Sequence, residues 1–197
     1  FNLILRCVGG TSMLKDDTNL EEMSDEAWGE EVSGLLEEMQ DSDCAVLTAD
    51  TGSKVSIGVS EFRKIYSEFW YQLTTTALLE GEKSARFQVE WIRDVVSRLV
   101  ELAGVSVPDL RLALSIGIYK IGHAVLDKTV ELRHKVQTAD RQLTVAKRSM
   151  STEKAGALKQ QIDLWKRTID DLEDLVSKTV MAIFAKRFKD SHESIRV

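Results

Sequence analysis

The chain has 197 residues, of which 43% are hydrophobic, with one proline and a formal net charge of −6. This content is sufficient for a sizeable core, and the absence of an apolar run of about 18 residues excludes a transmembrane helix. Leu, Glu, Lys and Val abound and alternating β-branched runs are few, so the composition favours an all-α fold.

The N-terminal part of the chain is expected to form short helices. Residues 1–8 resemble the buried end of a helix, and a second helix is predicted over about 25–39 with Ser24 as its N-cap. The apolar stripe of that second helix consists of Trp28, Val32, Leu35 and Met39. Residues 41–58 are rich in Asp, Ser, Thr and Gly, which is typical of a loop.

Two longer helices are predicted next. The first is capped by Ser60 and ends at Gly81, and the second runs between Ser84 and Gly104. In the first, one apolar face consists of Phe62, Ile65, Phe69, Leu73 and Ala77, widened by Tyr66 and Trp70. We therefore expect this helix to be covered on more than one side. In the second, the inward face consists of Phe87, Trp91, Val95, Leu99 and Leu102.

From Pro108, which suits the first turn of a helix, no strong helix breaker appears before Ser149. Two series of apolar and small residues alternate in steps of three and four, which is the seam of a coiled coil. The first is Ile118, Gly122, Val125, Thr129, Leu132, Val136, Ala139 and Leu143. The second is Leu158, Ile162, Trp165, Ile169, Leu172, Val176, Thr179 and Ile183. The series mirror each other about Met150, with Leu132 opposite Ile169, which predicts one antiparallel hairpin; two unrelated amphipathic helices are the alternative.

The expected fold is all-α: a helical-repeat-like (HEAT-type) bundle with a long protruding antiparallel helical hairpin. We expect an N-terminal helical domain with an acidic loop over 1–110, the hairpin over 111–187 and the start of a next helical repeat over 188–197. The apolar start and the end of the chain in mid-element suggest a fragment of a longer protein, and the start lacks the features of a signal peptide.

Charge and cysteine usage narrow the class of protein. Residues 1–110 contain 9 Lys and Arg against 21 Asp and Glu, a net −12, whereas residues 111–197 contain 17 against 11, a net +6. This division suggests a polyanionic partner, and a solvated coiled-coil surface with mixed charges is the alternative. Cys7 and Cys44 are predicted to be thiols in a reducing compartment, a disulfide between them being the alternative.

No motif for catalysis or metal binding is found in the sequence. His123, His134 and His192 lack the spacing of a metal site, and Gly9-Gly10 lacks the glycine and lysine of a phosphate-binding loop. The carboxylates at 170–174 suit the solvated face of a heptad helix. We therefore predict that the protein is not an enzyme and takes no cofactor and no metal.

Several segments, in this order and spacing, resemble the N-terminal region of the stromal-antigen (STAG) family, the helical-repeat subunit of the cohesin complex. Cys7-Val8-Gly9 is similar to the Cys-x-Gly that ends an apolar segment of the family and precedes a variable acidic stretch. The segment from Phe62-Arg63 to Glu68-Phe69 resembles the family's aromatic helix, and the long paired helices follow at the expected distance.

The most specific resemblance lies at the end of the chain. Residues 183–190 read Ile-Phe-Ala-Lys-Arg-Phe-Lys-Asp and precede Ile195-Arg196. They are similar to the family's Ile-Phe-x-x-Arg-Tyr-Arg-Asp, which is followed by Ile-Arg. Residues 107–113 differ, because Arg111 alone is kept of the two arginines in the family's Val-Arg-x-x-Arg-His-Thr.

The resemblance implies a nuclear, chromosome-associated cohesin subunit that binds double-stranded DNA without sequence preference and supports sister-chromatid cohesion and cohesin loading. It also implies binding to the kleisin subunit, mainly through regions beyond this fragment, and to other cohesin regulators. DNA binding of this kind needs Lys and Arg on a rigid surface. The candidate DNA-binding residues are Lys54, Arg63, Lys64, Arg111, Lys186, Arg187, Lys189 and Arg196. Lys147 and Arg148, at the hairpin tip, are further candidates.

Two other classes of function are compatible with the same sequence. A protein-binding scaffold would use the hairpin to dock another subunit and would bind duplex DNA negligibly at moderate salt. A membrane-surface helical dimer would need a second broad apolar face, whereas the seam residues are used within the hairpin. We therefore expect no membrane partner.

Overall fold

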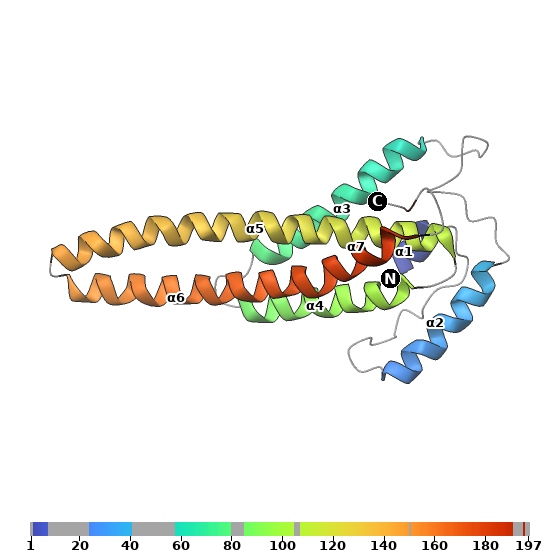
Figure 1. Ribbon diagram of the computed structural model, residues 1–197, viewed down its shortest axis with the longest axis horizontal. Coiled ribbons are helices and arrows are strands. Elements are labelled where there is room, and N and C mark those ends of the chain that lie inside the picture. Colours follow the sequence, from blue (N-terminus) through green and yellow to red (C-terminus); the bar gives the residue numbers. More distant parts are fainter. Residues whose placement is uncertain are drawn as a thin grey trace. The chain divides into compact units, whose positions relative to one another are not determined.

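The computed structural model describes residues 2–7, 24–40, 58–79, 85–104, 107–149, 151–190 and Ile195. Within these residues the chain is all-α, without a strand, so the predicted fold class is confirmed (Figure 1). The helices are α1 (Asn2–Cys7), α2 (Asp25–Gln40), α3 (Val59–Leu79), α4 (Ala85–Leu102), α5 (Pro108–Arg148), α6 (Thr152–Leu175), the π-helical η1 (Val176–Val180) and α7 (Met181–Arg187). The HEAT-type repeat stays a prediction.

The N-terminal helices α1 and α2 begin and pack largely as predicted. Ile4 and Leu5 of α1 are buried, and Cys7 is a buried free thiol whose pKa is raised by burial. Ser24 caps α2, because its Oγ accepts a hydrogen bond of 3.2 Å from the backbone N–H of Ala27. The stripe of α2 is buried at Trp28, Val32 and Leu35. Cys44 and residues 41–57 of the predicted loop (41–58) lie outside the described residues.

The start of α3 differs from the prediction. The helix begins at Val59, and Phe62 N–H donates a hydrogen bond of 2.9 Å to the carbonyl oxygen of Gly58. Ser60 therefore lies within the first turn and is not the cap. The predicted boundaries at Gly81 and Ser84 lie outside the described residues, whereas Gly104 does close α4, in the turn after Leu102.

The buried faces of α3 and α4 lie one residue further along than predicted at several positions. In α3, Tyr66 and Trp70 are buried, but the expected core residues Ile65, Phe69 and Leu73 are exposed. The prediction that α3 is covered on more than one side is therefore wrong for these three residues. In α4, Trp91 is exposed, while the buried residues are Val89, Ile92, Val96, Leu99 and Leu102.

The chain divides into two compact units, each built from segments that are distant in the sequence. Unit 1 comprises Phe1–Ser67, Leu99–Ile118 and Ile183–Val197, and unit 2 comprises Glu68–Arg98 and Tyr119–Ala182. The chain passes from one unit to the other after Ser67, Arg98, Ile118 and Ala182, each time within a helix. The predicted domain boundaries at residues 110 and 187 do not coincide with these positions.

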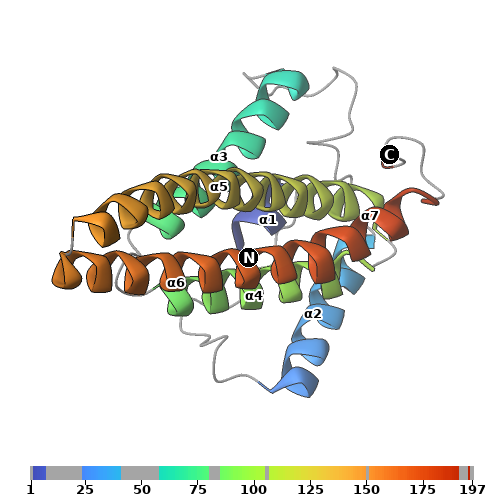
Figure 2. The same cartoon turned by 60° about the vertical axis from the view of Figure 1, so that its left-hand side comes forward.

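Unit 2 contains the predicted hairpin. The 41-residue α5 and the 24-residue α6 run antiparallel and side by side in both views (Figure 1, Figure 2). The chain reverses after α5, where Ser151 N–H donates a hydrogen bond of 3.1 Å to the carbonyl oxygen of Ala146. The buried seam residues of this unit are Gly122, Val125, Thr129, Leu132, Ala139, Ile162, Ile169 and Leu172. The position of the fold-back and the two-helix seam are thus confirmed.

Near the base of the hairpin Gly122 of α5 packs closely against the π-helical turn η1. A Cβ built on Gly122 would be 2.7 Å from Val180 Cγ2. The mirror arrangement places Gly122 opposite Thr179, whose side chain lies outside the described part of the chain. Glycine allows this close approach.

The unit-2 parts of α3 and α4 lie beside the base of the hairpin. Tyr71 of α3 donates a hydrogen bond of 2.8 Å to Asp127 of α5, and Arg93 of α4 pairs with Asp174 of α6 at 3.5 Å. Both views show the other end of the hairpin extending past these two helices (Figure 1, Figure 2). In the described part of unit 2, that outer end therefore consists of α5 and α6 alone.

Candidate nucleic-acid interface

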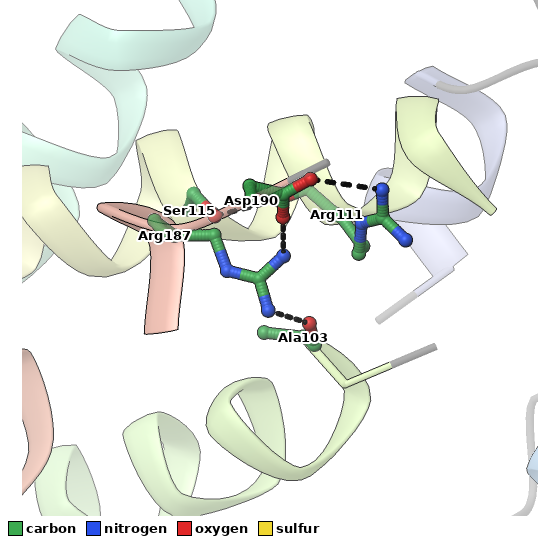
Figure 3. Close-up of polar contacts among 5 residues, drawn as sticks. All are labelled: Ala103, Arg111, Ser115, Arg187 and Asp190. Atoms are coloured by element: carbon green, nitrogen blue, oxygen red, sulfur yellow. Dashed lines mark hydrogen bonds and ion pairs between the residues drawn. The ribbon is translucent and has the colours of Figure 1, made fainter. Parts of the chain in front are cut away.

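The predicted basic cluster at the end of α7 is centred on a carboxylate in unit 1. Asp190 accepts hydrogen bonds from Arg187 and, at 3.1 Å, from Arg111 of α5 (Figure 3). The other terminal nitrogen of Arg187 donates a hydrogen bond of 2.7 Å to the carbonyl oxygen of Ala103, in the turn after α4. One guanidinium thus joins the end of α7 to the end of α4.

This network is buried and uses the geometry of arginine. Arg187 is 5% exposed and Asp190 is 8% exposed. The planar guanidinium presents several donors in a fixed fork, so that Arg187 reaches a carboxylate and a backbone carbonyl at once. Lysine would offer a single ammonium at this position. The arrangement stabilises the packing of three chain segments and leaves the Arg187 charge inside the protein.

The structure therefore places Arg187, a predicted DNA-binding residue, inside unit 1 and not on its surface. A guanidinium that is buried against Asp190 and Ala103 presents no donor to a phosphate in solution. Arg111 is in a similar position, because its side chain is 14% exposed and forms an ion pair with Asp190. The physical reason is that α7 ends at Arg187, and the turn that follows brings Asp190 back to the guanidinium.

The remaining predicted residues are placed differently from these two arginines. Lys64, Lys186 and Lys189 are exposed, and Arg63 is half-buried. All four belong to unit 1. Lys54 and Arg196 lie outside the described residues. Of the eight predicted residues, three exposed lysines therefore keep the accessibility that contact with a phosphate requires.

A larger group of cations lies on the outer hairpin, which we define as residues 135–168 on both sides of the fold-back. This segment contains 8 Lys and Arg against 3 Asp and Glu, a net charge of +5. The hairpin base, residues 119–134 and 169–182, contains 4 against 6, a net charge of −2. Positive charge therefore increases toward the fold-back.

Most outer-hairpin cations have no anionic partner among the described residues. Seven are exposed and form no ion pair with any residue that the structure describes: Arg141, Lys147, Arg148, Lys154, Lys159, Lys166 and Arg167. The hairpin base differs, because Arg133 pairs with Glu173 across the two helices and Lys178 pairs with Asp174 at 2.8 Å. Glu173 and Asp174, expected only on a solvated face, thus take part in ion pairs.

Only Lys147 and Arg148 of these seven cations are candidates on sequence grounds. The net charge of residues 111–197 includes the acidic residues at 170–174 as well as the basic outer hairpin, so it does not reveal where the positive charge is concentrated. The signal that identifies the group is the charge of a 34-residue window centred near the fold-back, where few carboxylates occur. The described residues contain no group of His, Cys, Asp and Glu that could hold a metal ion.

Comparison with known proteins leaves the family open. No protein-family model matches this sequence, and a search of curated proteins finds no match. The resemblance to the stromal-antigen family thus rests on its short segments, chiefly the one at 183–190. Among the helices that the structure describes, none is both long and apolar enough to cross a membrane.

Proposed function

We propose that this chain is the N-terminal region of a stromal-antigen-type cohesin subunit, a non-enzymatic helical scaffold that binds duplex DNA without sequence preference. In this role it supports sister-chromatid cohesion and cohesin loading on chromosomes in the nucleus. The kleisin contacts of such a subunit lie mainly in its other regions, and other cohesin regulators are further partners.

The family assignment is supported by the segment at 183–190. The arginine and the final aspartate of the family pattern correspond to Arg187 and Asp190, and these two side chains form the buried ion pair that reaches Ala103. The pattern thus falls on residues with a specific structural task in this fold. A chance likeness would be less expected to select two side chains that contact each other.

The DNA-binding proposal rests on one observation: in the C-terminal half of an otherwise acidic protein, several exposed cations form no ion pair with a described residue. Lysine and arginine on helices neutralise phosphates and release counterions, which favours binding without reading bases. Since the chain as a whole carries a net charge of −6, binding to DNA requires that this positive charge be local.

The direct test is the affinity of the full chain for unrelated duplexes of equal length, measured by fluorescence anisotropy between about 50 and 200 mM salt. We expect equal affinities for the different sequences and a logarithmic affinity that falls linearly with the logarithm of salt concentration, by about 0.9 per phosphate contact. Absence of binding at the lowest salt would reject the proposal.

The unit-1 lysines are tested with the variant Lys64→Glu/Lys186→Glu/Lys189→Glu, which leaves the buried Arg187 unchanged. A role in DNA contact predicts weaker binding and a smaller salt slope at an unchanged melting temperature. Lys178→Glu, at an exposed lysine of the hairpin base that pairs with Asp174, is the control for a single Lys→Glu change. An affinity equal to that of wild type would remove these three lysines from the interface.

A protein-binding scaffold is the second candidate, favoured by two exposed aromatic side chains. Phe184 and Phe188 are 40% and 57% exposed, and their rings stack with centroids 6.5 Å apart. Exposed rings of this kind suit an apolar protein partner better than a phosphate backbone. This candidate predicts negligible duplex binding at moderate salt, so the same anisotropy experiment separates the two functions.

A further inference from the structure

We infer that the outer hairpin, residues 135–168, is a duplex-DNA-binding surface that contacts the phosphate backbone along its length. The inference rests on the proposed DNA-binding function and deepens it, because it assigns the principal contact to a different part of the chain from the predicted cluster at 186–189. It is carried by the charge, the register and the dimensions of the two helices.

The accessible cations of this surface are held on a rigid support. Ala139 and Ala146 of α5 and Ile162 of α6 are buried in the seam, while the seven unpaired cations project into solvent. Small and β-branched residues in the seam allow the two helices to pack closely. The cations are therefore fixed to a two-helix rod and are presented without the entropy cost of ordering a loop.

The heptad register adds a second, independent observation. Arg133 and Glu173 flank the seam on the same side and form an ion pair. One heptad toward the fold-back, the equivalent positions hold Asp140 and Lys166, which are of opposite charge but form no ion pair with each other. Two heptads toward the fold-back they hold Lys147 and Lys159. The complementary pattern of this flank is thus replaced by two positive charges at the outer end.

Like charges that face each other across a helix pair weaken its packing, whereas opposite charges stabilise it. Neither Lys147 nor Lys159 has a carboxylate partner among the described residues, and both are exposed. An external anion between them would relieve this repulsion. This arrangement favours binding of a polyanion over a merely solvated surface, for which opposite charges would serve equally well and would stabilise the hairpin.

The dimensions favour an extended ligand over a single anion. Fourteen residues of α5, from 135 to 148, span about 20 Å at 1.5 Å per residue. Duplex DNA carries about one charge per 1.7 Å of its axis, so this length faces several phosphates. A straight rod of about 20 Å with cations on two parallel helices fits the side of a stiff duplex.

The surface does not have the composition of a membrane-binding helix pair. The large apolar side chains that are exposed in the described outer hairpin are Val145, at 65%, and Leu164, at 40%. A helix that lies in a membrane interface needs a broad apolar face of several such residues. An acidic protein segment shares the negative charge of DNA but not its stiffness. The comparison of poly-glutamate with duplex DNA, described below, distinguishes these two ligands.

The decisive variant is Lys147→Glu in the full chain, because it moves stability and DNA binding in opposite directions. It places a carboxylate at the position equivalent to Lys159, so we expect the melting temperature to stay equal or to rise. At the same time we expect duplex affinity to fall at least about threefold and the salt slope to fall by about 1. Loss of binding in this variant cannot be explained by unfolding.

The double variant Lys147→Glu/Lys159→Glu restores like charges, now negative. Its melting temperature should return to about that of wild type, while duplex affinity falls further. Lys178→Glu provides the matched control, since it makes the same change of charge at the hairpin base. A loss of affinity as large in Lys178→Glu as in Lys147→Glu would mean that only net charge matters and would overturn the inference.

The remaining outcomes separate this inference from the proposed function. If wild type binds duplexes and Lys147→Glu binds them equally well, the inference fails and the proposed function stands. If wild type binds no duplex, both fail. Poly-glutamate and vesicles with anionic lipid are measured in parallel at matched charge. Binding of either that exceeds duplex binding and is lost in Lys147→Glu would assign the surface to that ligand and reject DNA.

Discussion

Arg187, the last residue of α7, donates a hydrogen bond of 2.7 Å to the carbonyl oxygen of Ala103, in the turn that closes α4. These two residues are 84 positions apart in the sequence. The carbonyl lies at a helix end, where the regular backbone partners are missing. The same guanidinium forms an ion pair with Asp190, and Asp190 forms a second ion pair with Arg111. A side chain expected to face DNA is therefore part of the internal structure of unit 1.

The first prediction concerns this network. Arg187→Ala leaves Asp190 buried with one cation in place of two and leaves the Ala103 carbonyl without its donor. Removal of one member of a buried ion pair typically costs about 3–5 kcal/mol, so we expect a loss of stability of that order. Urea denaturation measures it. Lys186→Ala and Lys189→Ala, at exposed neighbours, should change stability by less than about 0.5 kcal/mol; equal effects in all three would contradict the network.

The second prediction concerns the close approach of Gly122 and Val180. Gly122→Ala gains about 1 kcal/mol of helix propensity but places a methyl group 2.7 Å from Val180 Cγ2, and such overpacking costs about 1–3 kcal/mol. We expect a net destabilisation, measured by thermal unfolding. Gly122→Ala/Val180→Ala should show a favourable coupling between the two sites. Gly156→Ala serves as control, because a Cβ built there meets no other described side chain or element within 4 Å, and it should stabilise the protein.

The hairpin could be predicted from sequence because its pattern is local and repetitive. Each seam residue, such as Leu132 or Ile169, follows the previous one by three or four positions, so the seam and the fold-back emerge without knowledge of any other element. The π-helical turn η1, whose Val180 lies against Gly122, could not be predicted in this way. The apolar spacing of three and four residues gives no indication of that turn.

The inward faces of α3 and α4 could be predicted less well, because adjacent stripes are both apolar. Phe69 and Trp70 are neighbours with similar hydrophobicity, yet the first is 41% exposed and the second 7%. The choice between them depends on tertiary partners, as the hydrogen bond of 3.2 Å from Tyr66 to the carbonyl of Ala113 illustrates. The burial of Arg187 could not be predicted for the same reason, since its partner Ala103 is remote in the sequence.

The third prediction concerns pH. Hydrogen bonds from Lys135 and Lys128, at 2.8 and 3.0 Å, hold the pKa of Glu131 below its usual value. A carboxyl whose pKa is lowered on folding contributes stability above its unfolded pKa, near 4.3, and loses it as the pH falls through the lower folded value. Because the side chain is 45% exposed, we expect only a few tenths of a kcal/mol.

Glu131→Gln should therefore be slightly less stable than wild type at pH 7, and the difference should vanish in acid below the pKa of Glu131. Chemical denaturation over this pH range measures it, and added salt should reduce it. Asp163→Asn is the control, since this exposed carboxylate forms no ion pair with a described residue. A difference between Glu131→Gln and wild type that persists in acid would exclude the ion pairs as its cause.

The fourth prediction tests the flanking register of the hairpin without reference to DNA. Arg133 and Glu173 form an ion pair across α5 and α6, with side chains 63% and 41% exposed. Arg133→Glu and Glu173→Arg each create like charges at facing positions and should each lower the melting temperature, whereas the double variant should recover most of the loss. A double-mutant cycle should give a coupling of about 0.2–1 kcal/mol, weaker at high salt. Zero coupling at low salt would mean that these positions do not face each other in solution, and the equivalence of Lys147 and Lys159 would fall with it.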